Sequence, residues 1–273
     1  MRPPSADIAA PEFVGRAAWL NGKRPSMAEL TANGPVLVHF FDFAQLNSVR
    51  ALPYVRAWHE RYGERGLTVL GVHSPRWPPT RERAEVAAAL ERLEVLHPVA
   101  VDSDYAIWAD YGCEGWPSLF LWGRGGALRW FHFGEGEYRS TEEEVQGLLR
   151  EAGAQRELPE PLEPLRATDA PDARVAAPSP EIFPGGSVTE PWQASEQDPA
   201  LELEYAAGGA HVTVSGEGEL RFALDDRPER AIQVAAPGLY ELASHERHEA
   251  HSLRLHPAAG QDIYSVSFAP GMP

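Results

Sequence analysis

The first half of the chain mixes short continuous apolar runs with runs in which apolar residues recur every three or four positions. The run Val36–Phe41 is apolar at almost every position and predicts a central strand buried on both faces. It leads directly into residues 47–62, whose apolar side chains fall on one stripe and predict an amphipathic helix with Pro53 in its interior. The other predicted elements are organised around this strand-to-helix turn.

Further strands and helices follow in alternation along the chain. The pattern predicts strands at 66–73 and 97–101, helices at 81–94 and 102–111, a hairpin of 116–122 with 127–133, and a last helix at 141–151. Ser140 and Glu143 form a capping-box pattern that places the start of the last helix at Thr141. This order predicts an α/β domain with a central mixed sheet flanked by helices, spanning residues 1–152.

The second half of the chain has a different pattern. Residues 153–183 are rich in proline and acidic residues, which predicts an extended linker between domains. From residue 184 to 273, short runs of alternating apolar and polar residues are separated by turn residues. This pattern predicts an all-β domain, an antiparallel sandwich.

Composition limits the partners of the chain. Its 273 residues suffice for two cores, and the net charge of −16 argues against nucleic acid or an anionic membrane as a partner. One cysteine cannot form an internal disulfide, so nothing requires an oxidising compartment. No apolar stretch is long enough to span a membrane, and the N-terminus lacks the apolar core of a secretory signal. We therefore expect a cytoplasmic protein; its oligomeric state is not set by these features.

Several motifs resemble one family. The strand-to-helix turn, the segment Tyr111–Leu121 with its Trp-Pro pair, and the stretches Leu52–His59 and Phe131–Tyr138 resemble thioredoxin-like redoxin domains of the TlpA, ResA and DipZ class, within the AhpC/TSA–redoxin superfamily. The resemblance covers residues 13–152 and implies the thioredoxin-like fold. The closing strand Val266–Phe268 is similar to the C-terminal β-sandwich of DipZ-type proteins.

The resemblance also shows a departure from the family at its redox motif. Where the family carries Cys-x-x-Cys at the start of the helix, this chain has Gln45 and Ser48. Disulfide exchange needs a thiolate and a resolving thiol, and neither side chain replaces sulfur. The resemblance further implies a cis peptide bond between Trp116 and Pro117, beside Gln45.

Two other residues near the degenerate motif have alternative interpretations. His39 is either a relic proton shuttle or a histidine that is hydrogen-bonded between strand and helix, and the second is favoured because no nucleophile remains to activate. Cys113 either packs in the core or is a reactive single thiol. The single thiol is the alternative by which the protein would act as a thiol-disulfide oxidoreductase.

The leading functional interpretation is a non-catalytic protein- or peptide-binding module that needs no cofactor. The family receives an extended segment of its partner at the active-site face, and here that face has a candidate apolar surface formed by Phe43, Leu46, Trp77, Trp116 and Pro117. Ordinary packing of these side chains in the core is the other interpretation.

The second domain offers two weaker possibilities. Carbohydrate binding needs an exposed aromatic platform, for which the candidates are Trp192, Tyr205 and Tyr240. The segment 244–251 contains three histidines that would meet a metal ion only if the segment curls, namely His245, His248 and His251. Their spacing matches no standard zinc pattern, so we predict a solvated loop and no metal site.

Overall fold

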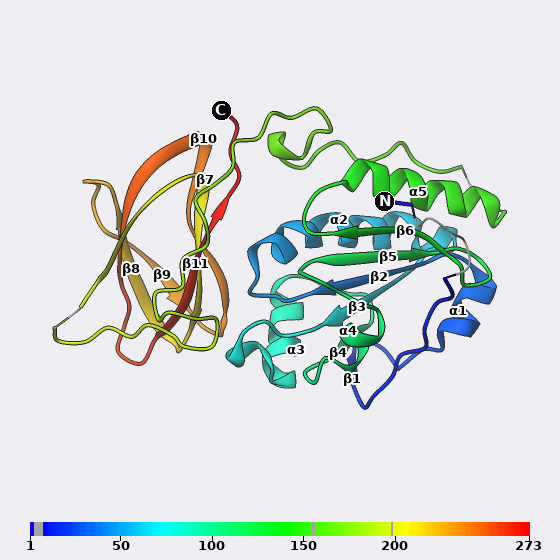
Figure 1. Cartoon of the computed structure of the whole chain (residues 1–273), viewed down its shortest axis with the longest axis horizontal. Helices are drawn as coiled ribbons and strands as arrows, with labels where there is room; N and C mark the ends of the chain where they lie inside the picture. Colours follow the sequence, from blue (N-terminus) through cyan, green and yellow to red (C-terminus); the bar gives the residue numbers. More distant parts are fainter. Residues whose placement is uncertain (3–7, 154–156, 198) are drawn as a thin grey trace. The chain divides into compact units, whose positions relative to one another are not determined.

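A computed structural model describes residues 1–2, 8–153, 157–197 and 199–273 (Figure 1). Contacts divide the chain into two units, which are described separately. Unit 1 consists of Met1–Phe43, Asn47–Pro75 and Arg81–Leu165, and unit 2 consists of Ala44–Leu46, Arg76–Thr80 and Arg166–Pro273.

The centre of unit 1 is a six-stranded mixed sheet with the order β1-β4-β3-β2-β5-β6. Its strands are β1 (Ala18–Leu20), β2 (Val36–Phe41), β3 (Thr68–His73), β4 (Val99–Val101), β5 (Ser118–Trp122) and β6 (Leu128–Phe133). Strand β3 pairs in parallel with β2 and β4, whereas β5 pairs antiparallel with β2 and β6. All six residues of β2 are buried, as predicted for a central strand.

Helices cover both faces of this sheet. They are α1 (Met27–Asn33), α2 (Leu46–Tyr62), α3 (Arg83–Arg92), α4 (Ala106–Asp110) and α5 (Tyr138–Glu151), with 3-10 turns at Gly63–Arg65, Pro78–Thr80 and Ala167–Asp169. Alternate residues of β2 face opposite sides: Leu37 packs with side chains of α2 and α5, whereas Val38 packs with Met27 of α1 and Ile107 of α4. The helices therefore bury both faces of β2.

Unit 2 is an all-antiparallel β unit with the strand order β11-β7-β10-β8-β9. Its strands are β7 (Leu201–Ser215), β8 (Gly218–Leu224), β9 (Arg230–Val234), β10 (Gly238–His256) and β11 (Asp262–Ala269). All five strands contribute side chains to one apolar core, including Val212, Phe222 and Leu253. The all-β class is as predicted, but β7 and β10 are long strands of 15 and 19 residues rather than short runs.

The histidine-rich segment 244–251 belongs to β10, so the prediction of a solvated loop is wrong. In the ladder with β7, Ser244 pairs with Gly209 and Glu249 pairs with Ala207. Residues 245–248 therefore form a four-residue bulge opposite Gly208 alone. The His248 N–H donates to the carbonyl oxygen of Met272 at 2.7 Å. The sequence did not reveal this because histidines and charged residues dominate the segment and leave no alternation of apolar and polar positions.

The predicted linker makes contacts at both of its ends. Leu158 and Leu162 pack against the core between α2 and α5, and the backbone N–H of Leu162 donates to Glu142 at 2.9 Å. Further along, Ile182 forms a β-bridge with Val266 of β11. Each end of the described part of this proline-rich segment is thus held by its own unit.

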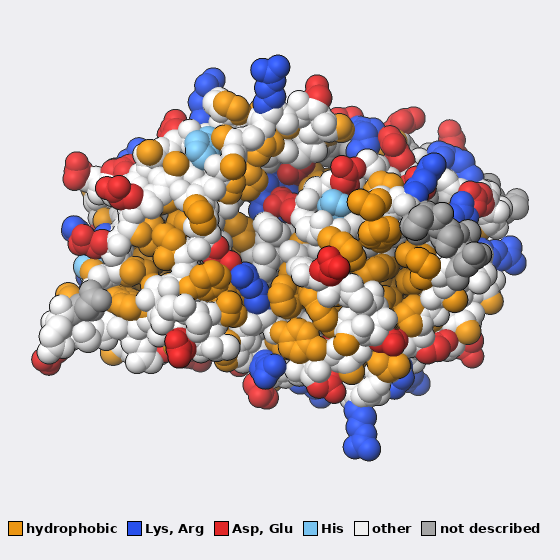
Figure 2. All heavy atoms as spheres, in the orientation of Figure 1, with side chains coloured by type: hydrophobic (Ala, Val, Ile, Leu, Met, Phe, Trp, Pro, Cys, Tyr) orange, Lys and Arg blue, Asp and Glu red, His pale blue; other side chains and the backbone are white. Residues whose placement is uncertain are grey.

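The described helices include none that is both long and apolar enough to cross a membrane. Figure 2 shows acidic side chains distributed over the visible surface, with basic ones between them. This distribution fits the net charge of −16.

Candidate functional site

The first turn of α2 lies where the family's dithiol would stand. Gln45 is the last residue before α2 and is partly exposed, whereas Ser48 is fully buried within the first turn. The backbone N–H of Asp42 donates to the Oγ of Ser48 at 3.3 Å. The Ser48 hydroxyl is therefore engaged in the fold.

Polar residues follow the carboxyl ends of β2 and β3 and are buried together. Nε2 of His73 lies 3.9 Å from Oδ1 of Asp42, and both side chains are 0% exposed. Burial lowers the pKa of His73, although the Asp42 carboxylate opposes this shift. We therefore expect a neutral imidazole beside Asp42, which supplies no general acid at neutral pH.

Asp102 follows β4 at the same edge of the sheet and stabilises the start of α4. It accepts hydrogen bonds from the N–H groups of Ile107 at 3.0 Å and Trp108 at 2.9 Å, and from Ser74 Oγ at 3.0 Å. Burial raises the pKa of Asp102, while these three bonds work against the rise. The sequence analysis missed Asp42, His73 and Asp102; their signal was a polar residue at or just beyond the end of each apolar strand.

Cys113 lies after α4, half-buried against the core that includes Phe120. Burial raises the pKa of its thiol well above the usual range, and a hydrogen bond with Ser118 only partly offsets this. The thiolate fraction at neutral pH is therefore very small. This environment is that of a structural cysteine rather than of a reactive one.

His39 is fully buried in β2, and neither ring nitrogen makes a hydrogen bond to a described residue. The expected hydrogen bonds between strand and helix are therefore wrong. Instead, the imidazole stacks on Phe41, with 5.2 Å between ring centroids. Burial lowers the pKa of His39 to about 3, and nearby His97 adds to the shift. A group that stays neutral cannot serve as a proton shuttle at neutral pH.

The sheet and the turns around it agree with the relatives found by comparison. Thiol-disulfide oxidoreductase YkuV of Bacillus subtilis is 28% identical over 141 residues, which cover 52% of this chain and 94% of YkuV. The Trp116–Pro117 bond is cis and directly precedes β5. The first half of the chain thus has a thioredoxin-like redoxin fold, and we refer to it as the redoxin domain.

Other relatives extend beyond the redoxin domain. Protein DipZ of Mycobacterium bovis is 28% identical over 299 residues, which cover 95% of this chain and 42% of DipZ. The chain thus spans about two fifths of the length of these DipZ relatives. Among solved structures, a thioredoxin-like protein in its oxidised form is 28% identical, covers 52% of this chain and has a TM-score of 0.49. No family model matches the chain.

Most of the candidate apolar surface of the redoxin domain is buried. Phe43, Leu46 and Trp77 are 0%, 4% and 1% exposed, and Pro117 is also buried. Within unit 2 as defined above, the indole of Trp77 contacts the ring of Tyr264, with 6.2 Å between centroids. Of the five predicted binding residues, only Trp116 is partly exposed.

Trp116 belongs to a group of partly exposed rings that we name the aromatic cluster: Tyr105, Trp108 and Trp116. The Trp108 and Trp116 rings lie 4.4 Å apart, and those of Tyr105 and Trp116 lie 6.5 Å apart. Nε1 of Trp116 donates to the carbonyl oxygen of Ser74 at 2.8 Å, which fixes the indole. The sequence analysis missed Tyr105 and Trp108 because it placed both in an ordinary helix.

The three candidate platform residues in unit 2 are engaged in its structure. Trp192 and Tyr240 are half-buried and pack against the core, and Tyr205 is 3% exposed within it. The hydroxyl of Tyr240 donates to the carbonyl oxygen of Ala236 at 2.7 Å. These three rings do not form an exposed flat surface of the kind that binds a sugar.

Proposed function

We propose that the redoxin domain performs no dithiol exchange and binds an extended peptide segment of a protein partner at the aromatic cluster. The absence of dithiol exchange is supported by the chemistry of three side chains, Gln45, Ser48 and Cys113. Gln45 and Ser48 stand in place of the two cysteines, and burial raises the pKa of the Cys113 thiol. No described group in the domain combines sulfur, exposure and a lowered pKa.

The aromatic cluster supports the binding part. Partly exposed, rigidly held aromatic rings are typical of the residues that contribute most to a protein interface. Trp116 directly precedes cis-Pro117, on the face where the family receives its partner. Its indole is held by Ser74 and packs against Trp108, so little side-chain freedom is lost on binding.

The charge around the cluster favours one class of peptide. Asp104, Asp110 and Glu114 are exposed in α4 and the turns on either side of it. Arg81, which lies beside Tyr105, offsets only part of this charge, so the remaining excess of negative charge attracts basic groups. We therefore propose that the bound segment carries apolar or aromatic residues with a neighbouring arginine or lysine.

Two measurements on the full chain test this function. Wild-type protein should catalyse no reduction of insulin by dithiothreitol, and turnover above the uncatalysed rate would refute the proposal.

For binding, peptides selected on the wild-type chain from a random library are titrated against Trp116→Ala and, as a matched exposed control, Leu96→Ala. We expect Trp116→Ala to weaken binding about tenfold or more and Leu96→Ala to leave it unchanged. Equal binding by all three proteins would reject the aromatic cluster as the site.

A single-thiol oxidoreductase is the second candidate, favoured by the name of the relative YkuV. It requires Cys113 to react in the native protein. We expect alkylation by iodoacetamide at least 100-fold slower in the native than in the denatured chain, because burial raises the pKa of this thiol. Rapid native alkylation would favour this candidate over the binding module.

A further inference from the structure

The bulge of β10 brings two distant histidines together. In a regular strand, His245 and His251 would lie about 20 Å apart, because each residue advances the chain by about 3.3 Å. Instead their rings are stacked, with centroids 3.9 Å apart and planes inclined by 19°. Residues 245–248 cause this by leaving the ladder opposite Gly208 and rejoining it at Glu249.

Glu249 completes a set of three metal-binding side chains. One ligand atom from each of His245, Glu249 and His251 lies within 4.8 Å of the other two. Two imidazoles and one carboxylate form a common zinc-binding set, which leaves one tetrahedral position for water or another ligand. Zinc bonds of about 2.0–2.2 Å bring ligand atoms to within about 3.5 Å of each other. The three side chains therefore need to approach by roughly 1 Å.

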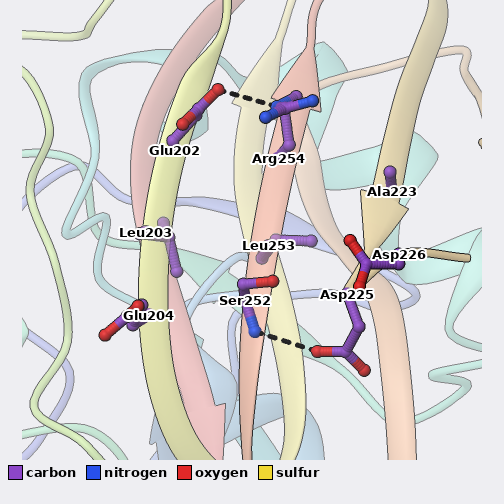
Figure 3. Close-up of a pocket in the computed structure, with 9 residues that line it drawn as sticks. All are labelled: Glu202, Leu203, Glu204, Ala223, Asp225, Asp226, Ser252, Leu253 and Arg254. Atoms are coloured by element: carbon purple, nitrogen blue, oxygen red, sulfur yellow. Dashed lines mark hydrogen bonds and ion pairs between the residues drawn. The ribbon is translucent and has the colours of Figure 1, made fainter.

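His251 is oriented as a metal ligand would be. Its Nδ1 lies 3.0 Å from Oδ2 of Asp225. The same carboxylate accepts the backbone N–H of Ser252 at 3.1 Å (Figure 3). An Nδ1–H donated to Asp225 leaves a lone pair on Nε2, as in the carboxylate–histidine–metal arrangement. That Nε2 is buried, makes no hydrogen bond to a described residue and lies 3.6 Å from Oε2 of Glu249.

His245 has a comparable support. Its Nε2 lies 2.9 Å from the hydroxyl oxygen of Tyr205, which is paired with His251 in the ladder. This contact leaves Nδ1 of His245 for an ion.

The surroundings attract cations. The pocket drawn in Figure 3 has a volume of about 500 Å³ and lies on β7, β8 and β10. Its lining includes the carboxylates of Glu202, Glu204, Asp225 and Asp226 and the single cationic side chain of Arg254. Asp225 lines this pocket and also contacts His251, so the excess negative charge of the pocket lies next to the three proposed ligands.

We propose that His245, Glu249 and His251 bind one divalent transition-metal ion of the zinc class, with Asp225 and Tyr205 as positioning residues. The site lies wholly in unit 2 and does not depend on the function proposed for the redoxin domain. Imidazole and carboxylate together suit Zn²⁺ and Co²⁺ better than Ca²⁺ or Mg²⁺, which prefer oxygen ligands alone.

The test is a titration of the full chain, stripped of metal by a chelator, with Zn²⁺ in a calorimeter and with Co²⁺ in a spectrophotometer. We expect one equivalent of each ion and the visible absorption of four-coordinate Co²⁺. His251→Ala should abolish the stoichiometric site, and Glu249→Gln should weaken it at least tenfold. Asp225→Asn should weaken it about 10- to 100-fold, because it frees the orientation and tautomer of His251.

The matched control is His256→Gln, because His256 also lies in β10 and pairs with a glutamate, Glu229, at 3.8 Å. Among the described residues, His256 belongs to no group of three potential metal ligands. It should bind Zn²⁺ like the wild type. Glu249→Gln should fold even if His251→Ala does not, because the Glu249 side chain is 55% exposed. Absence of saturable Zn²⁺ binding to the wild type would overturn the proposal, as would equal binding by wild type, His251→Ala and Glu249→Gln.

Discussion

The Oγ of Ser48 accepts a hydrogen bond from the backbone N–H of Asp42 at 3.3 Å, across the turn between β2 and α2. Ser48 thus connects the start of the helix to the end of the strand. A thiol accepts hydrogen bonds only weakly, so a cysteine at position 48 would form this connection less well.

Introducing cysteines at positions 45 and 48 should give the protein disulfide-reducing activity. We expect the double variant Gln45→Cys, Ser48→Cys to catalyse insulin reduction by dithiothreitol, because a helix N-terminus lowers the pKa of a cysteine there. The single variant Ser48→Cys is the control and should remain inactive, since it lacks the attacking thiol. A double variant that forms the disulfide yet shows no turnover would mean that the surrounding face is no longer suited to exchange.

Glu142 should stabilise the packing of the linker, near Leu162, against the redoxin domain. Its buried carboxylate accepts hydrogen bonds from Tyr62 Oη at 2.6 Å and from the N–H of Leu162 at 2.9 Å. Glu142→Ala leaves both donors unpaired, so we expect the free energy of unfolding of the redoxin domain to fall by about 2–4 kcal/mol. Urea denaturation measures this, with exposed Glu143→Ala as the control. A loss no greater than that of the control would contradict the prediction.

Acid should destabilise the redoxin domain through two buried histidines. Burial lowers the pKa values of His39 and His97 to about 3 in the folded chain, from the ordinary value of 6.5. Below pH 6.5 the unfolded chain binds protons that the folded chain does not, so stability falls as the pH falls towards 3. Between pH 7 and pH 5 the two histidines together should cost about 4 kcal/mol.

Urea denaturation across this pH range, followed by tryptophan fluorescence, measures the effect. His39→Leu removes one of the two groups and should reduce their combined pH dependence by about half. A stability that is unchanged from pH 7 to pH 5 would show that His39 and His97 are not held neutral.

Two glycines of the redoxin domain should respond oppositely to alanine. A Cβ on Gly71 in β3 would lie 2.9 Å from Cγ2 of Val99 and 3.1 Å from Cε1 of Phe41, so Gly71→Ala should destabilise by about 1–3 kcal/mol. A Cβ on Gly147 in α5 meets nothing within 4 Å. Gly147→Ala should therefore stabilise by about 0.5–1 kcal/mol. Thermal unfolding of both variants checks this, and a shift in the same direction would contradict it.

The sequence predicted the fold where local pattern and burial agree. The strand 36–41 coincides with β2, because a strand buried on both faces has an uninterrupted apolar run. The start of α5 was placed three residues late: the capping pattern of Ser140 and Glu143 is present, but the helix begins at Tyr138. Ser140 Oγ instead donates to the side chain of Glu137 at 2.8 Å.

The sites were less predictable, because they depend on exposure and on contacts distant in sequence. Phe43 and Leu46 were chosen as apolar residues beside the degenerate motif, yet both are buried. Trp108 was overlooked although its ring lies 4.4 Å from that of Trp116. Periodicity reports which residues are apolar, but it does not report which of them the fold leaves at the surface.

The bulge in β10 has a consequence for insertions and deletions. The pairs Ser244–Gly209 and Glu249–Ala207 fix the ladder on each side, so residues added to or removed from 245–248 leave the flanking register intact. The same change would move His245 away from His251. In related chains, the length of this bulge should therefore be a better guide to a paired imidazole site than the number of histidines in the segment.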